Sequence, residues 1–531
     1  MGLRTSYNAR LSLSSKTSSQ NLLPVQVRQS CLSHKLWHEK AARGELVIAK
    51  KKVKGGDGVY LLGQSANTVT GSLYLVKFGD KRIVLDAGLY QSASNSYLDN
   101  YKVNSRKIES DVIKADYLLI SHPHIDHVGL VPRLYKLGFR GRVISTKETK
   151  IFARDLLLNS AGILAGEARL LSKKYSRNYE PIYTEADVNS SLELFETYNN
   201  YNETVSLDDT VSIFMLPNSH CLGAVQYLIT LKDERKTRRI LFTGDIGRLH
   251  DNANHYVSKS GILDRRVDLV LSEATYGLGD RDTKRKRQQD IEILKQYIQS
   301  TAERGGSVVM PVFAFSRSSE VLTELYLAFK DDENFKIPVI VDGVLGAQMF
   351  RDYEKVLDGE DLCLWQDVLS WKNLRIIEDK KESDRQVASA EQAIILSSSG
   401  FMTNGRILQY AAKYLPDEKS TFVFTGWAGS NPTYLSYKIK NAKKYDSIKI
   451  AGRQVRCRAD CVSLQTFSCH MDAKGLQEYL GGKYFDATKI CLVHGDEDAK
   501  IALKARLQCE LSKNNKSTRV VIGALGSVLR L

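Results

Sequence analysis

Three histidines and one aspartate lie within six positions of the chain, in the stretch Ser121-His122-Pro123-His124-Ile125-Asp126-His127. The chain has only 10 histidines in 531 residues, so three in one loop are not a product of composition. The preceding run, Asp116–Ile120, is apolar and predicts a short buried strand that ends where the polar cluster begins. Imidazole nitrogen and carboxylate oxygen suit zinc. The alternation predicts that His122 and His124 face one metal, while Asp126 and His127 reach a second.

Further polar residues follow apolar, strand-like runs along the chain. They are Asp86, His220, Asp245, Glu273, His470 and His494. A lone histidine is usually structural. Histidines that complete an incomplete set of ligands are candidates for metal binding. Asp86, His220 and Asp245 each follow such a run as a ligand at a metal edge would, and Glu273 is a carboxylate at the end of a buried strand.

Length, charge and hydropathy narrow the class of protein. A chain of 531 residues predicts two or more domains, and 43% hydrophobic residues are enough for a sizeable core. The net charge of +15 favours a polyanionic partner, either nucleic acid or an anionic membrane surface. No apolar run approaches the roughly 18 residues that span a bilayer, so we expect no membrane-spanning segment. Of the two polyanions we favour nucleic acid, and we expect no membrane partner. Eight scattered cysteines indicate reduced thiols and a cytoplasmic location.

The first 53 residues are polar, serine-rich and basic, with no acidic residue before Glu39. A flexible extension is the favoured interpretation. Because a nucleic-acid contact and an organelle transit peptide share this composition, both stay open.

The rest of the chain divides into three segments. Residues 54–277 begin with strand-like runs, and residues 147–200 within them are predicted to be helical and solvated. Residues 278–463 alternate apolar strands with helices, which predicts a parallel α/β domain inserted into the first. Residues 464–531 return to metal-type residues and complete the first domain. No G-K-[ST] phosphate loop occurs, and Gly56-Asp57-Gly58 precedes a strand, unlike a dinucleotide fingerprint.

Taken in order, these motifs resemble those of the β-CASP branch of the metallo-β-lactamase superfamily, over residues 57–525. The matching points are Thr70-Gly71-Ser72, the stretch 121–127, Glu273-Ala274-Thr275-Tyr276-Gly277, Pro311-Val312-Phe313-Ala314, Ser398-Ser399-Gly400, His470 and Val493-His494-Gly495. The departures, Asn218-Ser219 and Cys469, remove no ligand. The resemblance implies an α/β fold in which a metallo-β-lactamase αββα sandwich carries an inserted parallel α/β β-CASP domain.

The resemblance also implies a site with two zinc ions. One ion would be held by His122, His124 and His220, the other by Asp126, His127 and His494, with Asp245 bridging both. Asp86 would orient the histidine loop, and Glu273 would pair with His470 so that its imidazolium acts as general acid. Asp126, Glu273, His470 and Asp86 are thus the expected catalytic set.

By resemblance, the activity is that of the branch that contains the polyadenylation endonuclease and its bacterial and archaeal homologues. A two-metal-activated hydroxide would cleave single-stranded RNA, as an endonuclease, a 5′-exonuclease or both, and leave a 3′-hydroxyl and a 5′-phosphate. The histidine at position 494 resembles the RNA-processing side, because the DNA-repair side typically has valine there. A DNA nuclease, a small-molecule hydrolase and a non-catalytic scaffold are the alternatives. A homodimer stays open.

Four residues of the inserted domain are candidates for substrate binding. Ser399, Gly400 and Arg406 can offer a hydroxyl, backbone N–H groups and a guanidinium to phosphates. Trp427 can stack on a base. The alternative for Trp427 is a glycine turn packed by a tryptophan.

Overall fold

The computed structural model describes residues 56–91, 100, 111–250, 255–280, 287–389, 391–426 and 432–531. These residues belong to one unit of the chain, Gly56–Leu531. The predicted basic extension over residues 1–53 lies outside the described residues, and so does Trp427.

The first sheet has seven strands. In spatial order they are β22 (Val528–Arg530), β1 (Gly58–Leu61), β2 (Leu73–Phe78), β3 (Lys81–Ala87), β4 (Tyr117–Leu119), β5 (Arg142–Ser145) and β6 (Phe195–Thr197). Strands from β22 to β3 are antiparallel, and those from β3 to β6 are parallel. Ile83 and Leu85 of β3 belong to the core shared with the second sheet, and Val84 belongs to the core under the helices. Alternate side chains of one strand therefore fill two cores.

The second sheet also has seven strands and packs face to face on the first. In spatial order they are β21 (Arg519–Ile522), β20 (Ala487–Val493), β11 (Val267–Glu273), β10 (Thr237–Phe242), β9 (Val225–Lys232), β8 (Val211–Pro217) and β7 (Thr204–Ser206). Val59 and Tyr74 of the first sheet share a core with Tyr227 and Leu269 of the second. The last segment of the chain contributes strands to both sheets, and therefore completes the sandwich.

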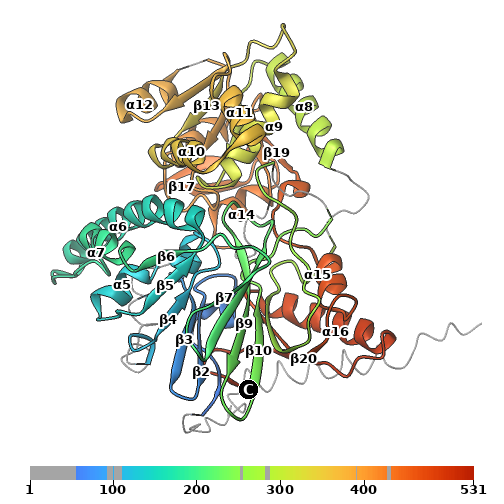
Figure 1. Cartoon of the computed structure of the whole chain (residues 1–531). Helices are drawn as coiled ribbons and strands as arrows, with labels where there is room; N and C mark the ends of the chain where they lie inside the picture. Colours follow the sequence, from blue (N-terminus) through green and yellow to red (C-terminus); the bar gives the residue numbers. More distant parts are fainter. Residues whose placement is uncertain are drawn as a thin grey trace, which may run out of the picture. The chain divides into compact units, whose positions relative to one another are not determined.

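Helices cover the outer face of each sheet (Figure 1). On the first sheet lie α4 (Ile125–Val128), α5 (Val131–Lys136), α6 (Lys147–Tyr175) and α7 (Glu185–Leu192); on the second lie α15 (Ala473–Leu480) and α16 (Glu497–Lys513). The short 3-10 helix η1 (Gln64–Ala66) follows β1. The prediction of one helical region over residues 147–200 is wrong in detail. The first helix ends where Ser176 takes a left-handed conformation (φ 48°), and β6 forms near the end of the region.

The third sheet has six strands, and all of them are parallel. In spatial order they are β14 (Leu374–Ile377), β13 (Val339–Asp342), β15 (Ile394–Ser397), β12 (Val308–Pro311), β16 (Thr421–Phe424) and β19 (Asp460–Ser463). Its strands are apolar runs because both faces are covered. A separate hairpin is formed by β17 (Ser447–Ile450) and β18 (Arg453–Arg456).

One face of this third sheet also packs against the sandwich. Helices α8 (Arg287–Glu303), α9 (Arg317–Phe329), α10 (Val344–Val356) and α11 (Gly359–Leu369) share that face's core with Phe152 and Leu156 of α6. The other face packs on α13 (Ile407–Tyr414), α14 (Leu435–Lys440) and the hairpin, with α12 (Lys380–Ala388) beside β14. The 3-10 helix η2 (Gln465–Phe467) leads back to the sandwich. The sheet's C-terminal strand ends thereby face the metal edge across a cleft.

The described chain contains no membrane-spanning helix and no disulfide bond. None of its helices combines the length and the apolar character needed to cross a bilayer. Its seven cysteines are all free thiols.

Candidate metal centre and active-site cleft

Asp86 holds the histidine loop in place where β4 ends. Its Oδ1 accepts a hydrogen bond from the Ser121 N–H at 2.7 Å, and its Oδ2 accepts one from Ser121 Oγ at 2.8 Å. Asp86 Oδ2 also lies 2.6 Å from His127 Nδ1. A carboxylate at Nδ1 keeps the proton on that nitrogen and leaves the Nε2 lone pair for a metal. Gly88 allows the two loops to touch, because a Cβ there would lie 1.6 Å from the carbonyl oxygen of Asp126.

The first ligand group consists of His122, His124, His220 and Asp245, whose ligand atoms lie within 4.8 Å of one another. His220 Nε2 lies 3.2 Å from His124 Nδ1, and Asp245 Oδ2 lies 3.7 Å from His122 Nε2. Burial lowers the pKa of His124 to about 4 and the pKa of the other two imidazoles well below the usual range. Neutral imidazoles keep the lone pairs that metal binding needs.

The second ligand group consists of Asp126, His127 and His494. His127 Nε2 lies 3.3 Å from His494 Nε2, and Asp126 Oδ2 lies 3.5 Å from the same His494 nitrogen. Asp245 Oδ1 faces this group, 3.4 Å from His127 Nε2 and 3.2 Å from His494 Nδ1. Asp245 therefore presents one carboxylate oxygen to each group, the arrangement of a bridging ligand.

The donor atoms fit tetrahedral metal ions. A zinc–nitrogen bond of about 2.0–2.1 Å in tetrahedral geometry places two nitrogen ligands about 3.3 Å apart. The facing nitrogen pairs of the two groups are 3.2 Å and 3.3 Å apart. In addition, His122 Nε2 is buried and has no hydrogen-bond partner among the residues that the structure describes. Such an atom costs about 1–3 kcal/mol, a cost that coordination at this nitrogen removes.

Glu273 and His470 form a carboxylate–imidazole pair beside the ligand groups. His470 Nδ1 lies 3.0 Å and 3.1 Å from the two carboxylate oxygens, and Glu273 Oε1 also accepts the Ile246 N–H at 2.7 Å. Burial lowers the pKa of His470, but the Glu273 carboxylate outweighs burial and raises that pKa to about 9. The other ring nitrogen, Nε2, is 4.0 Å from Asp245 Oδ2. Asp245, Glu273 and His470 also meet the distances of a metal site, but Nδ1 and a backbone N–H already occupy the Glu273 oxygens.

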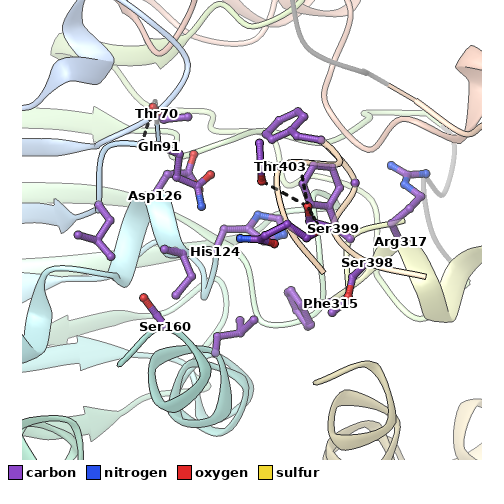
Figure 2. A pocket seen from close by; sticks show the side chains of 18 of the residues that line it. Thr70, Gln91, His124, Asp126, Ser160, Phe315, Arg317, Ser398, Ser399 and Thr403 are labelled. Atoms are coloured by element: carbon purple, nitrogen blue, oxygen red, sulfur yellow. Dashed lines mark hydrogen bonds between the residues drawn. The ribbon is translucent and has the colours of Figure 1, made fainter. Parts of the chain in front are cut away.

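A cavity of about 680 Å³ lies over this pair and the ligand groups. Its walls come from the sandwich and from the third sheet (Figure 2): His124 and Asp126 lie on one side, and Ser399 and Arg317 on the other. Ser399 Oγ accepts the Thr403 N–H at 3.2 Å, so this hydroxyl also orders its own loop. A Cβ at Gly400 would lie 2.8 Å from the ring of Phe313, so only glycine fits there without displacing the ring.

Arg406, one of the predicted phosphate contacts, is not among the residues that line the cavity. Its guanidinium forms an ion pair with Asp342, which is 1% exposed, and donates to the Glu378 carbonyl at 2.6 Å. Asp342 also accepts hydrogen bonds from Ser383 Oγ and Tyr410 Oη. A buried carboxylate needs such partners, so Arg406 serves the interior of the third sheet.

Three residues that the prediction omitted lie in the cavity wall after β12. Phe313 is 38% exposed, the ring of Phe315 lies 5.5 Å from that of His124, and Arg317 begins α9. Phe313 lies in the motif Pro311-Val312-Phe313-Ala314 that carried part of the family resemblance, and the signal common to all three was their place directly after an apolar strand.

Comparisons with known proteins agree with this architecture. Residues 66–281 match the metallo-beta-lactamase superfamily, residues 291–432 the Beta-Casp domain, and residues 454–520 the Zn-dependent metallo-hydrolase RNA specificity domain. Ribonuclease TTHA0252 of Thermus thermophilus is 26% identical over 445 residues, which cover 83% of this chain and 93% of that protein.

Two eukaryotic relatives are similar at the same level. Endoribonuclease YSH1 of Kluyveromyces lactis is 25% identical over 85% of this chain, and the match covers 57% of that longer protein. Integrator complex subunit 11 of Danio rerio is 26% identical over 85% of this chain and 72% of that protein. The fold and the ligand edge define a metal-dependent hydrolase. Within that class, the chain belongs to the β-CASP branch of the metallo-β-lactamase superfamily.

Proposed function

We propose that this chain is a ribonuclease that hydrolyses phosphodiester bonds of single-stranded RNA with two zinc ions, as an endonuclease, a 5′-exonuclease or both. The observation that carries the proposal is the Glu273–His470 pair, which holds a proton 4.0 Å from the carboxylate that both ligand groups share. The names of the Thermus and Kluyveromyces relatives, the match to an RNA specificity domain and the net charge of +15 support RNA as the substrate.

The two ligand groups would hold the metals, with His122, His124 and His220 in the first, Asp126, His127 and His494 in the second, and Asp245 between them. When bound, such metals supply Lewis acidity toward phosphate oxygens and a nucleophile at neutral pH. Asp86 keeps the proton of His127 on Nδ1 and so presents Nε2 to the centre. A phosphodiester is anionic and repels nucleophiles, so hydrolysis requires this concentration of positive charge.

His470 would supply the proton for the leaving oxygen. Glu273 accepts from Nδ1 and stabilises the imidazolium, so Nε2 carries the second proton toward the centre. Protonation of a leaving 3′-oxygen produces a 3′-hydroxyl on one fragment and a 5′-phosphate on the other. Glu273 acts through His470 in this scheme, since Ile246 N–H and His470 occupy its oxygens.

The cavity wall supports a single-stranded substrate. Phe313, in the described part of the wall, has an exposed aromatic ring that lies against Gly400 and 4.9 Å from the ring of Phe401 at an angle of 88°. An unpaired base can stack on such a ring, which a paired base inside a duplex cannot do. Ser399 and Gly400 stand beside Phe313, and are proposed to contact phosphate.

Cleavage of matched RNA and DNA tests the proposal. Zinc-loaded protein is incubated with 5′-labelled and internally labelled RNA and with DNA of the same sequence, and product lengths are read. We expect RNA to be cut far faster, with weaker binding as salt rises. Asp245→Asn serves as the inactive control. Equal rates on both polymers favour the DNA nuclease, and no cleavage of either contradicts the proposal.

A further inference from the structure

Arg317 is a cation of the cavity wall that the proposed mechanism does not use. It begins α9 directly after the β12 loop, and Figure 2 shows it on the same side of the cavity as Ser398 and Ser399. Among the described residues that line the cavity, it is the one arginine, and no lysine is among them. A polyanionic substrate in this cavity would therefore meet one wall guanidinium.

The Arg317 guanidinium lacks an anionic partner among the described residues. Within the described part of the chain, its Nη1 is buried with no hydrogen-bond partner, and its Nη2 donates to Cys469 Sγ at 3.4 Å. By contrast, Arg406 forms an ion pair with Asp342 in the same domain. A partly buried charge without a counterion is less well solvated than a free one, and a guanidinium fork matches phosphate oxygens in two parallel hydrogen bonds. An anion bound from the cavity would satisfy this group.

The pKa of the Cys469 thiol depends on the charges around Arg317. Burial raises its pKa, but the positive charges around it outweigh burial and hold that pKa below the usual value. These charges belong to Arg317, His470, Arg287 and Arg248. The region next to Arg317 is thus electropositive, as an anion-binding position requires.

The position of Arg317 assigns the anion to one end of the substrate. Arg317 contacts Cys469, and the charges of Arg317 and His470 both act on the Cys469 thiol, so the two cations lie close together in the wall of the cavity. Arg317 can therefore reach the part of the substrate that His470 would protonate. The leaving 3′-oxygen belongs to the nucleotide upstream of the cut. On that side, the next anion along the strand is the 5′-phosphate of the same nucleotide.

We propose that Arg317 binds this upstream phosphate, and that it thereby sets the register of RNA against the general acid. The inference rests on the proposed ribonuclease function and adds a substrate contact to it. The rival interpretation makes Arg317 a positioning residue that acts only through Cys469 on His470. In that case its loss would lower cleavage of every substrate by the same factor.

A methylphosphonate, which replaces one charged phosphate oxygen by methyl, separates these two interpretations. The zinc-loaded full chain is assayed on an RNA with one defined cleavage position, unmodified or with a methylphosphonate at the upstream phosphate. Wild type should lose about 10–100-fold in kcat/KM on the modified RNA, the range for a hydrogen-bonded charge pair. Arg317→Met should lose a similar factor on unmodified RNA and little more on the modified one.

Controls and a binding measurement complete the test. Arg385→Met removes an exposed arginine of α12 outside the cavity and should behave as wild type. Arg317→Lys should recover part of the loss, because lysine keeps the charge without the fork. In chelator, where RNA is bound but not cut, Arg317→Met should flatten the slope of log affinity against log salt by about 0.7, the value for one phosphate.

The outcomes divide cleanly. Cleavage of unmodified RNA by wild type establishes the ribonuclease, whatever the fate of Arg317. If Arg317→Met and the methylphosphonate reduce kcat/KM by independent, multiplying factors, or if the salt slope is unchanged, the phosphate contact is refuted and Arg317 positions His470. If wild type cleaves no RNA, the subsite falls with the function.

Discussion

His470 and His494 lie in similar surroundings at the cavity, but their loss should have different consequences. His494 Nε2 lies 3.3 Å from His127 Nε2 inside the second ligand group. His470 Nε2 lies 4.0 Å from Asp245 Oδ2, and its Nδ1 is already bonded to Glu273. His494→Ala should therefore weaken metal binding, whereas His470→Ala should remove a proton donor and no ligand.

The magnitudes follow from these two roles. Loss of a residue that only supports a ligand costs about 10–100-fold in metal affinity, and removal of the ligand His494 should cost more. Loss of a general acid lowers turnover by about 10²–10⁴-fold, which is about 3–5 kcal/mol in the activation barrier. His470→Ala should show this loss while its zinc content stays near that of wild type.

The assay combines metal analysis with two RNA substrates. One is unmodified, and the other carries a 3′-bridging phosphorothiolate, whose sulfur leaves without protonation. The modified RNA should restore much of the activity of His470→Ala and little of that of His494→Ala, while added zinc should help only the latter. His250→Ala, which removes an exposed histidine paired with Glu478, is the matched control. If His470→Ala loses zinc as His494→Ala does, His470 is a ligand and the assignment of the acid is refuted.

Three further predictions concern the metals, the dyad and the cavity wall. Purified protein should contain close to two zinc ions per chain, and a chelator should abolish cleavage; full activity of metal-free protein would exclude the metal mechanism. Glu273→Gln should move the alkaline limb of the pH–kcat/KM profile to lower pH, because a neutral amide no longer raises the pKa of His470. If the limb does not move, its pKa does not belong to His470. Phe313→Ala should weaken binding of single-stranded RNA in chelator by about 5–100-fold, the range for one stacked base, with Phe313→Tyr near wild type; equal affinities of all three proteins would rule out stacking at this ring.

The metal edge could be predicted from the sequence because its signals are local. Each ligand follows an apolar strand. His122, His124, Asp126 and His127 share one loop, and such a cluster of histidines and aspartate is typical of a metal site. The fold class was equally accessible, because apolar runs separated by helices indicate a sheet covered on both faces. The helical prediction over residues 147–200 missed β6, since helix ends and short strands depend on packing as much as on propensity.

The tertiary structure determines which residues of the inserted domain line the cavity. Arg406 and Arg317 look alike in the sequence, each following an apolar strand of the inserted domain. What separates them is a buried carboxylate, Asp342, which lies far from Arg406 in the sequence but beside it in the folded sheet. Among the described residues, Arg317 hydrogen-bonds to a thiol and to no carboxylate, and it lines the cavity instead. Metal ligands can be predicted from residue type, whereas the role of an arginine depends on which anion the fold brings within a few ångströms of it.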